Sequence, residues 1–245
     1  MRRQRRSPTG PLRGLDRVTA SFPWYDLAPV RWANDTIWRA VGLGGALDRW
    51  TPVEQQWRAD DLIVSQACGL DLFLADAPIE PVLAPVFELD CEEGSYYSYL
   101  VGAREGVAAV NSLSSRSGFT ALLTVCEPCS LIVTGSHQAS LAAVREGRAD
   151  MACIDAVTWG ILERGAPSEV EGLPVLDRTC PAPAPPYVVR RGGGGDVAHL
   201  ISNALQAEST KCAREALLLR GAIPATIDDY APILAEHHYA LSLTT

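Results

Sequence analysis

The sequence predicts an α/β fold of two lobes, with two crossing strands between them as a hinge. From residue 107 to residue 164, short apolar runs alternate with runs that carry apolar residues at helical spacing. Such alternation is typical of α/β folds built on parallel strands. After this inner part, the proline-rich stretch 179–191 favours an extended return of the chain. The chain is therefore expected to cross between an outer and an inner lobe twice.

The outer part of the chain begins with the same alternation. Apolar runs bounded by turn-forming residues predict strands at residues 18–22, 61–67, 80–89 and 96–102. Helical spacing predicts one helix at residues 29–41, with Trp32 and Trp38 among its apolar positions, and a charged helix around residues 52–58.

The inner part continues with strands at 107–110, 130–134 and 151–154, and with helices at 117–124, 136–146 and 156–164. A strand at 174–176 precedes the proline-rich stretch, and two final helices are predicted at 197–206 and 209–219. We therefore expect lobe I to contain residues 18–100 and 179–245, and lobe II residues 101–178. The hinge is expected at the crossings near 99–102 and 177–181.

The charge of the chain argues against a nucleic-acid-binding protein. The 245 residues carry a net charge of −8, although six arginines lie within the first seventeen positions. The rest of the chain is therefore acidic, which disfavours a nucleic-acid-binding face. Residues 1–17 also contain two prolines and two glycines, and we expect them to form a disordered basic arm.

Neither a secretory signal nor a membrane span is expected. No apolar run follows the basic residues, so the sequence as written predicts a cytoplasmic location. No stretch of about 18 apolar residues is present for a transmembrane helix. The seven cysteines are an odd set scattered along the chain, which agrees with reduced thiols.

Two of the cysteines form a C-x-x-C pair. The spacing of Cys126 and Cys129 permits a redox pair or half of a metal site. A structural zinc site needs a second pair, and the sequence has no other C-x-x-C. We therefore expect no metal and no cofactor, and we keep a soft ligand such as arsenite, bound by Cys68 or by this pair, as an alternative.

The most informative motif lies where an apolar strand turns into a helix. In the stretch A-V-N-S-L-S-S-R-S-G-F-T-A-L-L, polar residues occupy the predicted helix N-terminus. Helix N-termini have unpaired N–H groups and favour negative charge, so Ser115, Ser117 and Gly118 predict a cradle for an anion. The alternative is an ordinary serine cap.

Other predicted strands end in loops of similar character. In T-G-S-H, Gly135 allows a ligand to approach the backbone, Ser136 caps the helix and His137 lies in the first turn. Asp155 ends the strand M-A-C-I-D and either faces a ligand, orients His137 or caps the next helix. A surface histidine is the alternative for His137. The loops P-W-Y-D and S-Q-A-C-G offer Trp24, Tyr25 and Gln66.

These loops favour binding over catalysis. The sequence has no G-x-S-x-G, no H-E-x-x-H and no phosphate loop with its lysine. Near the C-terminus, Glu236, His237 and His238 form a weak metal motif, because adjacent helical residues point about 100° apart. We expect them to belong to a solvated surface.

The order of these motifs resembles the PhnD-like family of phosphate, phosphite and phosphonate ABC-transporter substrate-binding proteins, over roughly residues 18–190. The resemblance is carried by S-x-S-G followed by G-S-H-x-x-S-L-x-x-V-x-x-G-x-x-D-x-x-x-x-D. It implies a type II periplasmic-binding-protein fold, in which two α/β lobes close over the ligand. Arg116, between the two serines, is expected to point to solvent or to reach the anion.

The resemblance also implies a set of ligand-binding residues. One lobe would hold the oxyanion through Ser115, Ser117, the amide of Gly118 and the segment Gly135, Ser136 and His137. Tyr25 and Gln66 would line the opposite lobe, and Asp155 would face the variable part of the ligand.

The resulting hypothesis is a non-catalytic binding protein for a small oxyanion of the phosphonate or phosphate class, with an ABC permease as a possible partner. No nucleic-acid partner is expected. The alternatives are a cytosolic sensor, an enzyme of cofactor biosynthesis on the same fold, or the thiol-based binder of a soft ligand.

Overall fold

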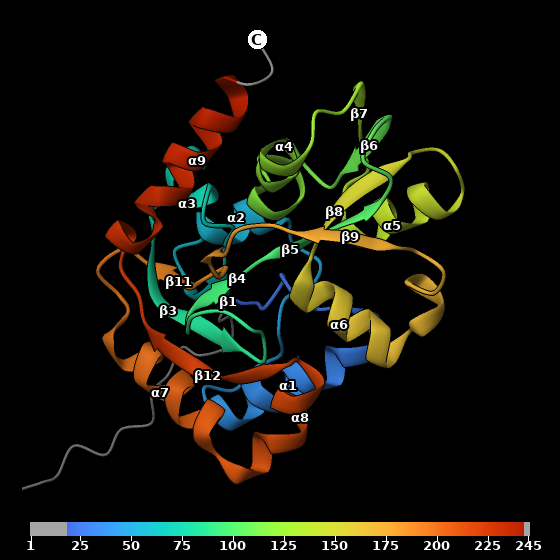
Figure 1. Ribbon diagram of the computed structural model, residues 1–245. Helices are drawn as coiled ribbons and strands as arrows, with labels where there is room; N and C mark the ends of the chain where they lie inside the picture. The colour runs from blue at the N-terminus through green and yellow to red at the C-terminus, as the bar shows by residue number, and fades with distance from the viewer. Residues whose placement is uncertain (1–18, 243–245) are drawn as a thin grey trace, which may run out of the picture.

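The computed structural model of the chain describes residues 19–242, which form two five-stranded β-sheets and one two-stranded sheet, with helices around them (Figure 1). The basic arm expected at residues 1–17 lies outside the described residues. Over residues 19–242, none of the helices combines the length and the apolar character that a membrane crossing requires.

The first sheet contains five strands in the order β1-β2-β11-β3-β12. β1 and β2 are parallel, and the other neighbours are antiparallel. Helices α1, α7 and α8 pack together beside this sheet, at the end of the molecule that carries β12 (Figure 1). The bounds are β1 Thr19–Ala20, β2 Leu62–Gln66, β3 Ile79–Phe87, β11 Tyr187–Arg190, β12 Leu219–Pro224, α1 Arg31–Val41, α2 Val53–Trp57, α3 Asp71–Leu74, α7 Gly195–Gln206 and α8 Lys211–Ala216.

The second sheet has the order β7-β6-β8-β5-β9. Its strands β7, β6 and β8 are parallel, whereas β5 is antiparallel to both β8 and β9. The bounds are β5 Ser98–Gly102, β6 Val107–Val110, β7 Ser130–Val133, β8 Met151–Asp155, β9 Val175–Arg178, α4 Ala121–Val125, α5 His137–Arg145 and α6 Ala156–Gly165.

Both faces of the second sheet are covered by apolar side chains. Along β5, Leu100 belongs to a core cluster on one face and its neighbour Val101 to a cluster on the other. Ala108 and Ala109 of β6 divide between the same two clusters. Successive strand residues point to opposite faces, so a strand that is apolar at every position is buried on both sides.

The predicted helices and strands of residues 19–218 are present, with ends shifted by a few residues, and the parallel strands expected between residues 107 and 154 are confirmed. Both sheets are mixed, because strands from distant parts of the chain enter each sheet in the reverse direction. The proline-rich stretch 179–191 also contains two strands, β10 (Ala182–Pro183), which pairs with β4 (Ser95–Tyr96), and β11. The prolines end at Pro186, so the N–H groups of β11 remain available for pairing inside the first sheet.

The C-terminal region differs most from the expectation. After α8 the chain forms β12 and a helix, α9 (Ala231–Ser242), neither of which was predicted. The solvated surface expected at Glu236, His237 and His238 is wrong for His237, which is 7% exposed. It is buried because α9 packs against α4 and against η2 (Arg116–Thr120), a π-helical turn. The remaining short turns are 3-10 helices: η1 Ala28–Val30, η3 Pro167–Glu169, η4 Glu208–Thr210 and η5 Ile227–Tyr230.

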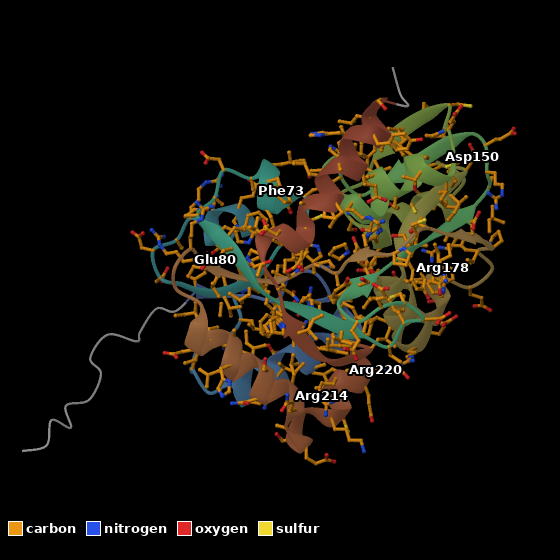
Figure 2. The ribbon with its side chains drawn as sticks, turned by 60° about the vertical axis from the view of Figure 1, so that its left-hand side comes forward. Phe73, Glu80, Asp150, Arg178, Arg214 and Arg220 are labelled. Atoms are coloured by element: carbon orange, nitrogen blue, oxygen red, sulfur yellow. The ribbon has the colours of Figure 1, made fainter. Side chains whose placement is uncertain are left out.

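The chain passes between the sheets where β4 leads into β5 and where β9 leads into β10. Arg178, at the end of β9, stacks its guanidinium over the ring of Tyr97 at 4.6 Å from the ring centre. Figure 2 shows Arg178 and Asp150 in the half that contains the second sheet, and Glu80, Arg214 and Arg220 in the other half. The expected lobe boundary at residue 100 falls inside β5.

We predict that Gly102→Ala lowers the free energy of unfolding by about 2–4 kcal/mol, because the new Cβ is strained and crowded. Gly102 has a φ of +95°, and a Cβ there would collide with the carbonyl oxygen of Asp150. Urea denaturation provides the measurement. The matched control is Gly195→Ala, whose Cβ meets no atom within 4 Å and which should not lower stability. Equal losses in the two variants would contradict the prediction.

Candidate functional site

A cavity of about 310 Å³ lies between the carboxyl ends of strands from both sheets. The loop after β1 contributes Tyr25, and the loop after β2 contributes Cys68. From the second sheet come Ser115 and Ser117 after β6, Ser136 and His137 after β7, and Asp155 at the end of β8. The second sheet therefore places three strand-to-helix junctions at one cleft, which is the usual place for a ligand in an α/β fold.

The first junction is the serine-rich turn. The Oγ of Ser115 accepts a hydrogen bond from the N–H of Gly118 at 3.0 Å, so this serine caps η2. The N–H groups of Phe119 and Thr120 donate to the carbonyl oxygen of Ser115 at 3.1 and 3.0 Å. The Oγ of Ser117 lies 3.4 Å from that of Ser115. Two hydroxyls therefore stand side by side at the start of the turn.

The second junction brings His137 to these serines. Ser136 caps α5 by accepting from the N–H of Ala139 at 3.1 Å. The Nε2 of His137 lies 2.9 Å from the Oγ of Ser117, which excludes the alternative of an isolated surface histidine. Burial lowers the pKa of His137 to about 4. The imidazole is therefore neutral at pH 7, with one ring nitrogen as donor and the other as acceptor.

The third junction combines a helix cap with a contact across the cleft. One oxygen of Asp155 accepts from the N–H groups of Val157 and Thr158, at 2.8 and 3.1 Å, and caps α6. The other oxygen accepts from the hydroxyl of Tyr25 at 2.9 Å. Burial raises the pKa of Asp155 to about 6 and the pKa of Tyr25 well above its usual value. The Tyr25–Asp155 bond joins residues of the two sheets.

Arg116 does not reach the cleft or the solvent, so both expectations for this residue are wrong. Its side chain is 1% exposed, and Nε and Nη2 each donate to Glu236 at 2.9 Å. Nη2 also donates to the carbonyl oxygen of Cys180 at 2.9 Å. Among residues 19–242, no lysine or arginine lines the cleft.

Two of the residues expected at the site do not line the cleft. The side chain of Gln66 is buried, and its Oε1 accepts a hydrogen bond from the N–H of Trp24 at 3.2 Å. Gln66 therefore supports Trp24, which lines the cleft. The N–H of Gly118 is occupied by Ser115. Gly135 does line the cleft, with a φ of +93° that suits glycine.

Several residues that line the cleft were not predicted from the sequence. Asp71, at the start of α3, accepts from the N–H of Cys68 at 3.2 Å, and burial raises its pKa to about 6. Tyr96 reaches the cleft from β4, which belongs to neither large sheet. Other lining residues lie next to the motifs recognised in the sequence, and their position could have identified them. They are Asn111, Ser112, Ser114, Gln138 and Thr158.

The cysteines do not form a common site. Cys68 lines the cleft, where burial raises the pKa of its thiol to about 11. Cys126 instead lies 3.5 Å from the sulfur of Met151 in the core beside α4. Within the part of the chain that the structure describes, no three histidine, cysteine, aspartate or glutamate side chains converge on a possible metal position.

Solved structures with the same fold include binding proteins for phosphonates. A binding protein component of an ABC phosphonate transporter from Pseudomonas aeruginosa is 13% identical, with a TM-score of 0.69 over 93% of this chain and 87% of that one. PhnD1 from Prochlorococcus marinus, solved with methylphosphonate, is 14% identical, with a TM-score of 0.68 over 92% of this chain and 98% of that one. These similarities confirm the type II periplasmic-binding-protein fold.

The family comparison covers more than half of the chain. The family described as "ABC transporter, phosphonate, periplasmic substrate-binding protein" matches residues 94–234, whereas none of the curated proteins compared with the chain matches it. The family is periplasmic by this description, and the cytoplasmic location expected from the sequence finds no support. The chain belongs to the family of periplasmic substrate-binding proteins of phosphonate ABC transporters.

Proposed function

We propose that this protein is a non-catalytic receptor that binds a phosphonate in the cleft and presents it to an ABC permease. The observation that carries the proposal is the convergence of Ser117 and His137, whose Oγ and Nε2 lie 2.9 Å apart although they come from different strand-to-helix junctions. An oxyanion placed between them receives hydrogen bonds from both junctions. The capped starts of η2 and α5 add the favourable field of helix N-termini.

The side chains at each junction determine which part of the ligand they contact. In this proposal Ser115, Ser117, Ser136 and His137 hold the phosphonate oxygens, and Gly135, which has no side chain, allows close approach to the backbone. Gly118 and Gln66 support the site indirectly, through Ser115 and Trp24. Tyr25 and Asp155 face the organic part of the ligand from the two sides of the cleft.

The chemistry of His137 favours binding over catalysis. A serine beside a histidine is the arrangement that nucleophilic enzymes use, and there the histidine must accept the serine proton. With a pKa of about 4, His137 is a weak base at neutral pH. A weakly basic imidazole beside the serine supports a role as hydrogen-bonding ligand.

The electrostatics of the cleft favour a ligand that carries a positive charge as well as the oxyanion. The lining contains two carboxyl groups, Asp71 and Asp155, and no lysine or arginine among the described residues. Burial raises the pKa of each carboxyl to about 6. A nearby cation would therefore stabilise the ionised form of each carboxyl. An aminoalkylphosphonate supplies an ammonium for these acids and a phosphonate for the serines.

The two sheets are the natural halves of a closing receptor. We propose that they move as lobes, with residues 101–178 forming most of lobe II and the hinge near residues 99–102 and 177–181. A ligand that contacts serines on one side and Tyr25 on the other binds the closed state better than the open one. Such differential binding is what shifts a conformational equilibrium.

We predict that Ser117→Ala weakens the binding of 2-aminoethylphosphonate by about 1–3 kcal/mol, the usual cost of removing a donor from a charged acceptor. Isothermal titration calorimetry with 2-aminoethylphosphonate, methylphosphonate and sulfate provides the measurement. The matched control is Ser130→Ala, a change at an exposed serine of β7. Unchanged affinity in Ser117→Ala would show that the serine turn does not bind the ligand.

We predict that the affinity for 2-aminoethylphosphonate rises with pH through about 6 in the wild type, and that Asp155→Asn flattens this dependence. Only the ionised carboxylate attracts the ammonium, so affinity is gained as the pH rises through the pKa of Asp155. Asparagine keeps an oxygen that can cap α6. The ligand titrates identically in both proteins, so the difference between the two titration series reports on Asp155. If affinity depends on pH identically in the wild type and in Asp155→Asn, the ammonium does not bind next to Asp155.

A further inference from the structure

Helix α9 connects the cores of the two sheets. Near its start, Ile233 belongs to the core cluster of the first sheet. Near its end, Ala240 belongs to the cluster of the second sheet that contains Phe119 and Leu122. Figure 1 shows α9 running alongside α4, and α9 also contacts η2, the turn that carries Ser117. The C-terminal helix therefore lies directly behind the proposed anion-binding turn.

The contact between α9 and this turn is a buried ion pair. Arg116 and Glu236 form two parallel hydrogen bonds of 2.9 Å, with the arginine 1% and the glutamate 23% exposed. The guanidinium also donates to the carbonyl oxygen of Cys180, between β9 and β10, and lies 5.6 Å from the ring centre of Tyr96. One arginine thus joins the turn, the helix and one of the two crossings.

A second contact fixes the other end of the turn. The Oγ1 of Thr120 lies 2.7 Å from the Nδ1 of His237, the residue that follows Glu236 in α9. The ring of His237 also meets the ring of Phe119 edge to face, with 6.1 Å between their centres. Arg116 and Thr120, the first and last residues of η2, are therefore both attached to α9.

Stability alone gives little reason for such an arrangement. Burying an arginine costs desolvation, and replacing a buried ion pair by well-packed apolar side chains is often neutral or stabilising. Bidentate pairing instead fixes the direction of the guanidinium, and so of the backbone that carries it. The two residues beside Arg116 are Ser115 and Ser117, which both line the cleft and whose hydroxyl oxygens lie 3.4 Å apart.

We propose that Glu236 is a positioning residue, which acts through Arg116 to hold Ser115 and Ser117 in the orientation that binds the ligand. The effect on ligand affinity rests on the function proposed above, whereas the effect on the turn itself does not. Removing the charge of Glu236 leaves the buried Arg116 without its counter-charge and without the bidentate pair. The turn then loses its fixed orientation although every residue that touches the ligand is still present.

The test compares Glu236→Gln with Ala240→Gly, a variant that loosens α9 one turn further on and keeps the ion pair intact. We expect Glu236→Gln to raise the Kd for 2-aminoethylphosphonate about tenfold, a typical size for coupling between residues of one network. We expect Ala240→Gly to lower the melting temperature but to leave the Kd within about twofold. Equal effects of the two variants on affinity would reduce Glu236 to a structural role and overturn the proposal.

A double-mutant cycle shows whether Glu236 acts through the serines. In the Ser117→Ala background, Glu236→Gln should cost much less affinity than in the wild type, because the hydroxyl that it positions is gone. Fully additive losses would overturn the proposal. If Glu236→Gln does not fold, Glu236→Asp, which keeps the charge and shortens its reach, takes its place with the same expected order of effects.

Hydrogen exchange of the backbone amides at residues 116–121 provides a measurement that needs no ligand. These amides should exchange faster in Glu236→Gln than in Ala240→Gly, because only the first variant disrupts the ion pair with Arg116. Unchanged exchange would overturn the proposal. If the wild type binds none of the phosphonates, the proposed function fails, and the exchange measurement alone decides whether Glu236 holds the turn.

Discussion

The structure depends on how the second sheet satisfies the N–H groups at its strand-to-helix junctions. Ser115, Ser136 and Asp155 each place a side-chain oxygen on the free N–H groups of the helix or turn that follows. Because the parallel strands β6, β7 and β8 end at one edge of the sheet, the three caps converge on one cleft. Groups that first serve local folding therefore also create a surface rich in donors, to which an anion is the natural partner.

As the proposed anion site, the same cleft is unusual because no lysine or arginine of the described residues lines it. The arginine closest in sequence to the serines is turned away and neutralised by Glu236. Oriented hydroxyls, the neutral imidazole of His137 and helix N-termini must then supply the attraction. Uncharged donors in fixed positions select a ligand by geometry more than by charge. The buried acids Asp71 and Asp155 add a preference that a purely cationic site would lack.

The parts of this design that were predictable are those encoded locally. Capping residues, apolar periodicity and the change from strand to helix are patterns of neighbouring residues, and they suffice to place Ser117, His137 and Asp155 at strand ends. The mixed sheets and α9 depend on contacts between distant segments. Arg116 shows the limit most clearly, since its partner Glu236 is 120 positions away and nothing near either residue indicates the pair.

The capped junctions also explain how one site can be stable without a ligand and still bind one. In the structure Ser115 is occupied by the N–H of Gly118, and Ser117 is paired with His137. A hydroxyl has one donor hydrogen and two acceptor lone pairs, so Ser115 can keep its cap while donating to an oxyanion. In the proposed complex, hydrogen bonds to the ligand replace the one between Ser117 and His137. Binding thus exchanges one hydrogen bond for another, and the net gain comes from the charge of the new acceptor.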